Sequence, residues 1–150
     1  MDKRMSAREI NMRTAELWAK RGTCKRKNVG CVIAKHGRVL VSGFTGVPAG
    51  LPHCIDVGCD IDPETGGCIR TSHAEANAIT WAARNGIMIY GAELFTTLAP
   101  CISCAKLIIT SGISKVYYGE PYRDDRGIAI LKRACVPTAL YVNENKIEWV

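Results

Sequence analysis

Three side chains of this sequence could bind one metal ion, and a fourth could move a proton beside it. The imidazole of His73 and the thiols of Cys101 and Cys104 are ligands that zinc accepts in a tetrahedral arrangement. Glu75 follows His73 closely enough for its carboxylate to reach a water bound to the metal. Three protein ligands leave the fourth position of zinc to water, which is the arrangement of catalytic rather than structural sites.

Neither half of this pattern is specific alone. A histidine and a glutamate at a helix start usually belong to an ordinary capped helix, and Cys101-Ile102-Ser103-Cys104 could be a redox pair or half of a structural zinc site. Together they are more informative, because each stands at an expected helix start and one expected strand separates them. Helix N-termini carry partial positive charge, which favours thiolate ligands. The sequence therefore predicts a catalytic zinc site.

Strands and helices alternate along much of the chain and would position these groups. The expected elements are helix 6–21, strands 29–34 and 38–44, loop 45–70, helix 73–85, strand 92–98, helix 100–111, strand 115–118, helix 125–134 and strand 138–142. A turn at His36-Gly37 makes the first two strands an antiparallel hairpin and leaves His36 in solvent. The later alternation indicates parallel crossovers. We expect one three-layer α/β/α domain over residues 1–150, with a mixed five-stranded sheet.

Composition and charge narrow the class of protein. Hydrophobic residues make up 47% and charged residues 23%, which is typical of a globular protein. No apolar run approaches the roughly 18 residues that span a bilayer, and no apolar stretch follows Met1–Arg4, so we expect a cytoplasmic protein without a secretory signal. The net charge of +6 favours an anionic partner, either nucleic acid or nucleotide phosphate, although a solvated basic surface would explain it equally.

The order of these motifs resembles that of deoxycytidylate (dCMP) deaminases of the cytidine deaminase superfamily, of the phage and bacterial type. The similarity covers nearly the whole chain and includes Val29–Ile33, Gly43–Gly50, His73–Ile79, Pro100–Cys104 and Tyr122–Asp124. The resemblance implies zinc-dependent hydrolysis of dCMP to dUMP and ammonia, which supplies the precursor of thymidylate. It also implies that Glu75 moves the protons and that the backbone of Ala74 contacts the pyrimidine edge.

A dCMP substrate would need cations for its phosphate. The candidates are the cations Lys25, Arg26, Lys27 and Arg123 and the hydroxyl donor Tyr122, of which Arg26 and Tyr122 are favoured. For each of them, a solvated charged turn is the alternative explanation. Thr45 stands where relatives commonly have an asparagine that helps to hold the sugar, and its shorter hydroxyl can both donate and accept a hydrogen bond.

The resemblance further implies regulation and assembly. Gly43, Phe44 and Gly46 lie near the family's allosteric site, where dCTP with Mg²⁺ activates and dTTP inhibits. The family implies a homohexamer.

Eight cysteines are many for a chain of this length, and outside the secretory pathway they favour metal ligands or free thiols over disulfides. Some relatives have a second, structural zinc that joins the two regions holding Cys24, Cys54, Cys59 and Cys68, with His53 as an alternative ligand. Such a site would cross-link a loop that lacks an apolar core, whereas free thiols are the alternative. Cys31 and Cys135 lie in apolar runs, where we expect them in the core.

Two other functions compete with this interpretation. A deaminase that acts on adenosine in tRNA would suit the positive charge, but Tyr122–Asp124 and the cysteine-rich loop argue against it. A non-catalytic zinc module would keep the fold without chemistry. Glu75 argues against that module, because a purely structural metal site does not use such a carboxylate.

Overall fold

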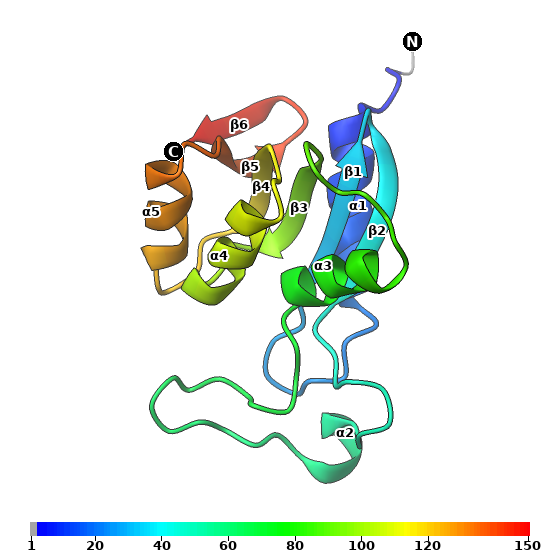
Figure 1. Ribbon diagram of the computed structural model, residues 1–150, viewed down its shortest axis with the longest axis vertical. Coiled ribbons are helices and arrows are strands. Elements are labelled where there is room, and N and C mark those ends of the chain that lie inside the picture. Colours follow the sequence, from blue (N-terminus) through cyan, green and yellow to red (C-terminus); the bar gives the residue numbers. More distant parts are fainter. Residues whose placement is uncertain (1–2) are drawn as a thin grey trace.

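The computed structural model describes residues 3–150, and in this range a mixed sheet is flanked by helices (Figure 1). The strands are β1 (Gly30–Lys35), β2 (Arg38–Phe44), β3 (Glu93–Leu98), β4 (Lys115–Glu120), β5 (Thr138–Asn143) and β6 (Lys146–Trp149). Their order across the sheet is β2-β1-β3-β4-β5-β6. β1 pairs antiparallel with β2 and β3, β3 to β5 are parallel, and β6 returns antiparallel to β5. The expected hairpin and parallel crossovers are thus confirmed.

The helices are α1 (Ala7–Ala19), α2 (Cys54–Val57), α3 (Ala74–Arg84), α4 (Ile102–Thr110) and α5 (Arg126–Arg133). Four of them begin and end close to the expected positions, whereas the short helix α2 lies within residues 45–70, which we expected to form a loop. The side chain of Ser6 accepts a hydrogen bond from the backbone N–H of Glu9 at 3.1 Å, as its place before α1 predicts. The chain leaves α3 through Gly86 and α4 through Gly112, both at positive φ.

Successive strand residues point to opposite faces of the sheet and bury two separate apolar layers. On one face, Met12 and Ala15 of α1 pack on Val32 and Phe95. On the other face, residues of α3, α4 and α5 pack on the neighbouring strand positions; this layer includes Ala78, Ala105, Leu131, Cys31, Ile33 and Leu94. The α/β/α layering predicted from the alternation of elements is confirmed.

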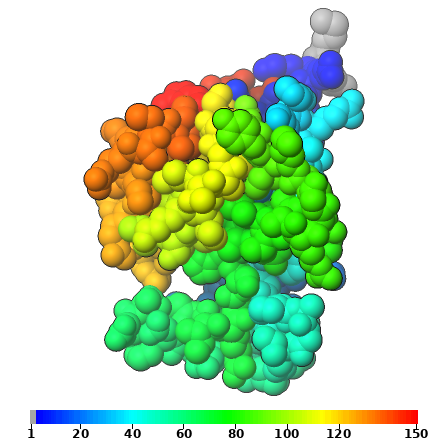
Figure 2. All heavy atoms as spheres, in the orientation of Figure 1, coloured from blue at the N-terminus to red at the C-terminus, as the bar shows by residue number. Residues whose placement is uncertain are grey.

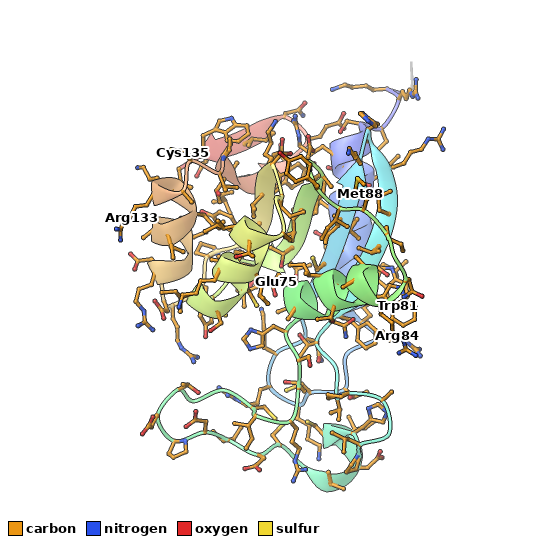
Figure 3. All side chains as sticks on the ribbon, in the orientation of Figure 1. Glu75, Trp81, Arg84, Met88, Arg133 and Cys135 are labelled. Atoms are coloured by element: carbon orange, nitrogen blue, oxygen red, sulfur yellow. The ribbon has the colours of Figure 1, made fainter. Side chains whose placement is uncertain are left out.

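Two details, one of the sheet and one of the cysteines, differ from the expectations. The sheet has six strands among the described residues rather than five, because Lys146–Trp149 adds an edge strand beside β5. That strand is largely exposed, so it lacks the apolar run that marks the inner strands. Cys31 is fully buried as expected, but Cys135 is exposed, at a positive φ beyond the end of α5 (Figure 3). His36 is exposed in the hairpin turn, as expected.

Residues 49–71, here called the cysteine lobe, project from one end of the molecule (Figure 1). The lobe contains the short helix α2 and an isolated bridge between Ile61 and Cys68. Figure 2 shows the cysteine lobe as a separate layer at the bottom of the view, below the rest of the molecule. Among the described residues, no helix combines the length and apolarity that crossing a membrane requires.

Candidate active site and thiol cluster

The starts of α3 and α4 bring the predicted metal ligands together. His73 caps the N-terminus of α3 and Cys101 caps that of α4, so both side chains project from helix starts. Nδ1 of His73 lies 3.4 Å from Sγ of Cys101 and 3.5 Å from Sγ of Cys104. Backbone hydrogen bonds between Gly46 and Ser72 hold the chain that enters α3 against the end of β2.

These distances fit zinc. Zinc lies about 2.0–2.1 Å from imidazole nitrogen and about 2.3 Å from thiolate sulfur, so a tetrahedral angle separates such ligands by about 3.5 Å. The Cys104 thiol, together with His73, lowers the pKa of Cys101 to about 4, although burial opposes this shift. Cys101 in turn raises the pKa of His73. Without metal the pair therefore favours thiolate and imidazolium, and zinc binding would release the imidazole proton.

The carboxyl of Glu75 lies buried beside these ligands, in the first turn of α3 (Figure 3). Glu75 is only 4% exposed, and this burial raises the pKa of its carboxyl. The hydroxyl of Thr96, from β3, lies 3.4 Å from Oε1 of Glu75 and donates to the carbonyl of Leu98 at 3.0 Å. A carboxyl with a raised pKa suits a group that must first accept a proton and then donate it.

A cavity of about 380 Å³ opens over His73 and Glu75. Its lining includes most of the residues that we predicted to bind substrate: Arg26, Lys27, Thr45, Ala74, Tyr122 and Arg123. Lys25 does not belong to the lining, although it adjoins Arg26 in the sequence. The lining therefore combines two of the metal ligands, His73 and Cys101, with several cations.

The cations of the lining differ in their partners. Lys27 forms an ion pair with Glu120, Nζ to Oε2 at 2.9 Å. Arg123 donates to the backbone carbonyl of Thr65 at 2.8 Å and lies over the ring of Tyr122. Arg26 makes no hydrogen bond or ion pair within residues 3–150, so its guanidinium is the cation most available to an anion. Glu120 was not predicted as a site residue, because as the last residue of β4 it carries no distinguishing sequence signal.

The hydroxyl of Thr45 is already engaged by the backbone. It accepts the N–H of Val29 at 2.9 Å and lies 3.4 Å from the carbonyl of the same residue. Thr45 is buried and belongs to the cavity lining. Its bonds join the residue after β2 to the residue before β1, so this side chain shapes the wall of the cavity.

The three residues predicted to lie near an allosteric site do not line the cavity. A Cβ on Gly43 would lie 2.2 Å from the carbonyl oxygen of Ala74, so this glycine allows β2 to approach the start of α3. Phe44 stacks on Trp18 with a centroid distance of 5.9 Å. Gly46 makes the backbone pair with Ser72 that precedes His73.

Four further cysteines form a second group, here called the thiol cluster (Cys24, Cys54, Cys59 and Cys68). Sγ of Cys24 lies 3.8 Å from Sγ of Cys59, and Sγ of Cys54 lies 3.7 Å from that of Cys68. The last three thiols all lie within 4.8 Å of one another. The backbone N–H groups of Asp60 and Arg70 hydrogen-bond to Cys68 and lower its pKa, although burial opposes them. Nδ1 of His53 instead faces the hydroxyl of Thr23 at 3.2 Å.

Comparison with known proteins agrees with this fold and site. The protein-family model described as cytidine and deoxycytidylate deaminase zinc-binding region matches residues 5–120, and the chain belongs to this family. The deoxycytidylate deaminase of Enterobacteria phage T4 is 33% identical, over 74% of this chain and 76% of that protein. The crystal structure of the dCMP deaminase from cyanophage S-TIM5, in complex with dCMP and dUMP, has a TM-score of 0.82 at 35% identity, and covers 93% of this chain and 100% of that one.

Other relatives are longer than this chain. ComE operon protein 2 of Bacillus subtilis is 42% identical, over 80% of this chain and 62% of that protein. The deoxycytidylate deaminase of Saccharomyces cerevisiae is 36% identical, over 82% of this chain and 41% of its own length. The match therefore spans less than two thirds of each of these two relatives.

Proposed function

We propose that the chain is a zinc-dependent deaminase that hydrolyses dCMP to dUMP and ammonia in the cytoplasm and so feeds dTMP synthesis. The observation that carries this proposal is the buried carboxyl of Glu75 beside a His-Cys-Cys set, inside a cavity with cations along its walls. A purely structural metal site does not require that carboxyl. The named phage and yeast relatives support dCMP as the substrate.

The residues divide the chemistry between them. Zinc held by His73, Cys101 and Cys104 would activate a water for attack on C4 of the pyrimidine. Glu75 would accept one proton of that water and pass it to N3 of the ring; it would then take the remaining proton from the hydroxyl now on C4 and pass it to the amine, which leaves as ammonia. The backbone of Ala74, which lines the cavity, contacts the pyrimidine edge. The sum is dCMP plus water giving dUMP plus ammonia.

Arg26 is the principal phosphate ligand in this proposal, and Tyr122 assists it. Both residues line the cavity, and the Arg26 guanidinium has the five donors that suit a phosphate. Lys27 is ion-paired with Glu120, and Arg123 donates a hydrogen bond to the Thr65 carbonyl. Both cations are therefore less available to the phosphate than Arg26. Thr45 shapes the sugar end of the cavity by its backbone bonds.

We assign a second, structural zinc to the thiol cluster. Zn–S bonds of about 2.3 Å in a tetrahedron separate the sulfur atoms by about 3.8 Å. Cys54 and Cys68 lie at 3.7 Å, within a group of three that includes Cys59, and Cys24 lies 3.8 Å from Cys59 although it is outside that group, so Cys24 would shift to complete the tetrahedron. Backbone N–H groups directed at Cys68 also favour a thiolate there. His53 faces Thr23, which supports four cysteines as the ligands.

Regulation and assembly complete the proposal. Activation by dCTP with Mg²⁺ and inhibition by dTTP would act near Gly43, Phe44 and Gly46, at the end of β2. There Gly43 contacts the start of α3, and Phe44 stacks on Trp18 of α1. A homohexamer would cover apolar groups such as Trp81 and Met88, which are exposed on and beyond α3 (Figure 3). Measuring the rate with each triphosphate, and the mass in solution, tests these two points.

Ammonia release from four substrates tests the proposed reaction. We expect turnover of dCMP to exceed that of deoxycytidine, CMP and a tRNA stem-loop. Preferred deamination of the stem-loop would replace the proposal with nucleic-acid editing. A chain that binds zinc and releases no ammonia from any of the four would instead indicate a non-catalytic module.

A further inference from the structure

The cysteine lobe has almost no interior of its own. Its large apolar side chains are 44% to 65% exposed; they are Leu51, Ile55, Val57, Ile61 and Ile69. Neither apolar layer of the described structure contains a residue from 49–71. Within the lobe, Cys54 alone is fully buried. Because little apolar surface is removed from water there, the hydrophobic effect contributes little to holding the lobe in place.

The thiol cluster joins the lobe to the segment between α1 and β1, which the exposed hydrogen bond between His53 and Thr23 also links to the lobe. Cys54, Cys59 and Cys68 come from the lobe, whereas Cys24 comes from the segment between α1 and β1. The lobe and that segment are far apart in the sequence, and the Cys24–Cys59 contact brings them side by side. The position of each segment therefore depends on the cluster.

Both segments also build the wall of the cavity. Gly67, Cys68 and Thr71 of the lobe line it, and so does Cys24. At the tip of the lobe, the Thr65 carbonyl accepts the hydrogen bond that holds Arg123. These contacts place the lobe directly against the groups that would meet a phosphate.

Arg26 lies in a turn whose hydrogen bonds include the backbone of Cys24, a member of the cluster. The side chain of Asn28 accepts the N–H of Cys24 at 3.1 Å and donates to the carbonyl of Cys24 at 2.9 Å. This pair of bonds closes residues 24–28 into a turn that carries Arg26 and Lys27. A displacement of Cys24 would therefore displace both cations.

The groups of the chemical step have a different support. His73 and Glu75 belong to the start of α3, and Cys101 and Cys104 to the start of α4. Both helices are anchored in the apolar layer through residues such as Ala78 and Ile108. The catalytic groups therefore have an anchor in the apolar layer, which the residues of the cysteine lobe lack.

We infer that the thiol cluster positions the phosphate-binding wall of the cavity, so that its integrity sets recognition of the substrate phosphate and leaves the chemical step intact. This inference rests on the proposed function and gives the second metal site a role in substrate specificity. The four cysteines are positioning residues in this role, since they act through Arg26 and Arg123.

The test compares Cys59→Ser with Cys135→Ser. Cys59 belongs to the cluster but not to the cavity lining, and Cys135 is exposed elsewhere. In Cys59→Ser we expect zinc to fall from about two to about one per chain. The KM for dCMP should rise roughly tenfold or more, the loss expected for weakened charge-assisted hydrogen bonds. We expect kcat and the KM for deoxycytidine to change little, and Cys135→Ser to match the unmodified chain in every measurement.

Asn28→Ala provides a second test that leaves all four thiols in place. It opens the turn that carries Arg26, so the KM for dCMP should rise while the zinc content stays at about two per chain. An unchanged KM for dCMP in Cys59→Ser, despite the loss of one zinc, would overturn the inference. An equal loss of kcat on dCMP and deoxycytidine would overturn it as well.

Hydrogen–deuterium exchange separates this inference from the proposed function. Residues 24–28, 65–71 and 121–123 should exchange faster in Cys59→Ser than in Cys135→Ser, while α3 and α4 stay protected. The exchange rates can be interpreted even if the unmodified chain releases no ammonia from dCMP. That result would refute dCMP as the substrate and leave the positioning role untouched. Equal exchange of the wall segments in both variants would refute the positioning role.

Discussion

The hydroxyl of Thr96 lies 3.4 Å from Oε1 of Glu75, on the side of the carboxyl that faces β3. Thr96 is fully buried, and its hydroxyl is also 3.0 Å from the carbonyl of Leu98. The hydroxyl has one proton, which it can give either to the Leu98 carbonyl or to Glu75, and when it gives it to Glu75 this contact orients a carboxyl that must alternate between water and substrate. Thr96→Val should therefore lower kcat about fivefold, the value of one hydrogen bond, with KM and zinc content nearly unchanged. Thr96→Ser should restore kcat; if it does not, the hydroxyl is not the relevant group.

Glu75→Gln keeps the shape of the side chain and removes its ability to take a proton. We expect kcat for dCMP to fall by roughly 10²–10⁴-fold, because general acid–base transfer contributes about that much. Zinc content should stay that of the unmodified chain, since Glu75 is not among the ligands. Metal analysis and an ammonia assay measure both quantities. Undiminished turnover would refute the assigned role.

Arg26 and Lys25 offer a matched pair, because only Arg26 lines the cavity. Arg26→Gln should raise the KM for dCMP roughly tenfold to a hundredfold, as expected for losing a charge-assisted bond to phosphate. Lys25→Gln removes the same charge from the same segment and should leave KM close to its original value. Equal effects of the two substitutions would indicate general electrostatic attraction instead of a specific contact.

Gly43→Ala should destabilise the protein, because the added Cβ would lie 2.2 Å from the Ala74 carbonyl oxygen. Overpacking of this kind typically costs about 1–3 kcal/mol. The clash occurs at the start of α3, so activity should fall together with the Tm. Gly67→Ala is the control, since the nearest atom to its Cβ is 3.5 Å away. Thermal unfolding of both variants measures the difference.

Glu9 predicts a pH dependence of stability. Tyr141 donates to Oε2 of this carboxylate and Arg13 to Oε1, and these bonds lower the pKa of Glu9 below its ordinary value of 4.5. Because the pKa of Glu9 is lower in the folded state, its stabilising contribution is complete above its ordinary pKa of 4.5. The contribution is lost as the pH falls through the folded-state pKa. Glu9→Gln should therefore lower the Tm at pH 7, and the difference should shrink in acid. A constant difference across that range would refute the assignment.

Much of the fold was predictable from local pattern. The N-cap at Ser6, the glycines that end α3 and α4, and the turn at His36-Gly37 each act over a few residues, so the sequence indicates them directly. β6 was missed because its alternation of polar and apolar residues extends over only four positions, Lys146–Trp149. Cys135 was placed wrongly in the core because the apolar residues around it do not reveal that the chain turns outward beyond α5.

The sequence by itself determined which side chains could bind zinc and move a proton, since ligand chemistry depends on residue type and the two motifs stand at helix starts. Tertiary structure decided which of the cations reach the cavity, how Lys27 pairs with Glu120, and that Thr96 contacts Glu75. It also decided that Cys24 meets Cys59, across 35 positions of the chain. These contacts arise from the packing of elements far apart in the sequence, and no local pattern records the distance at which two such elements will meet.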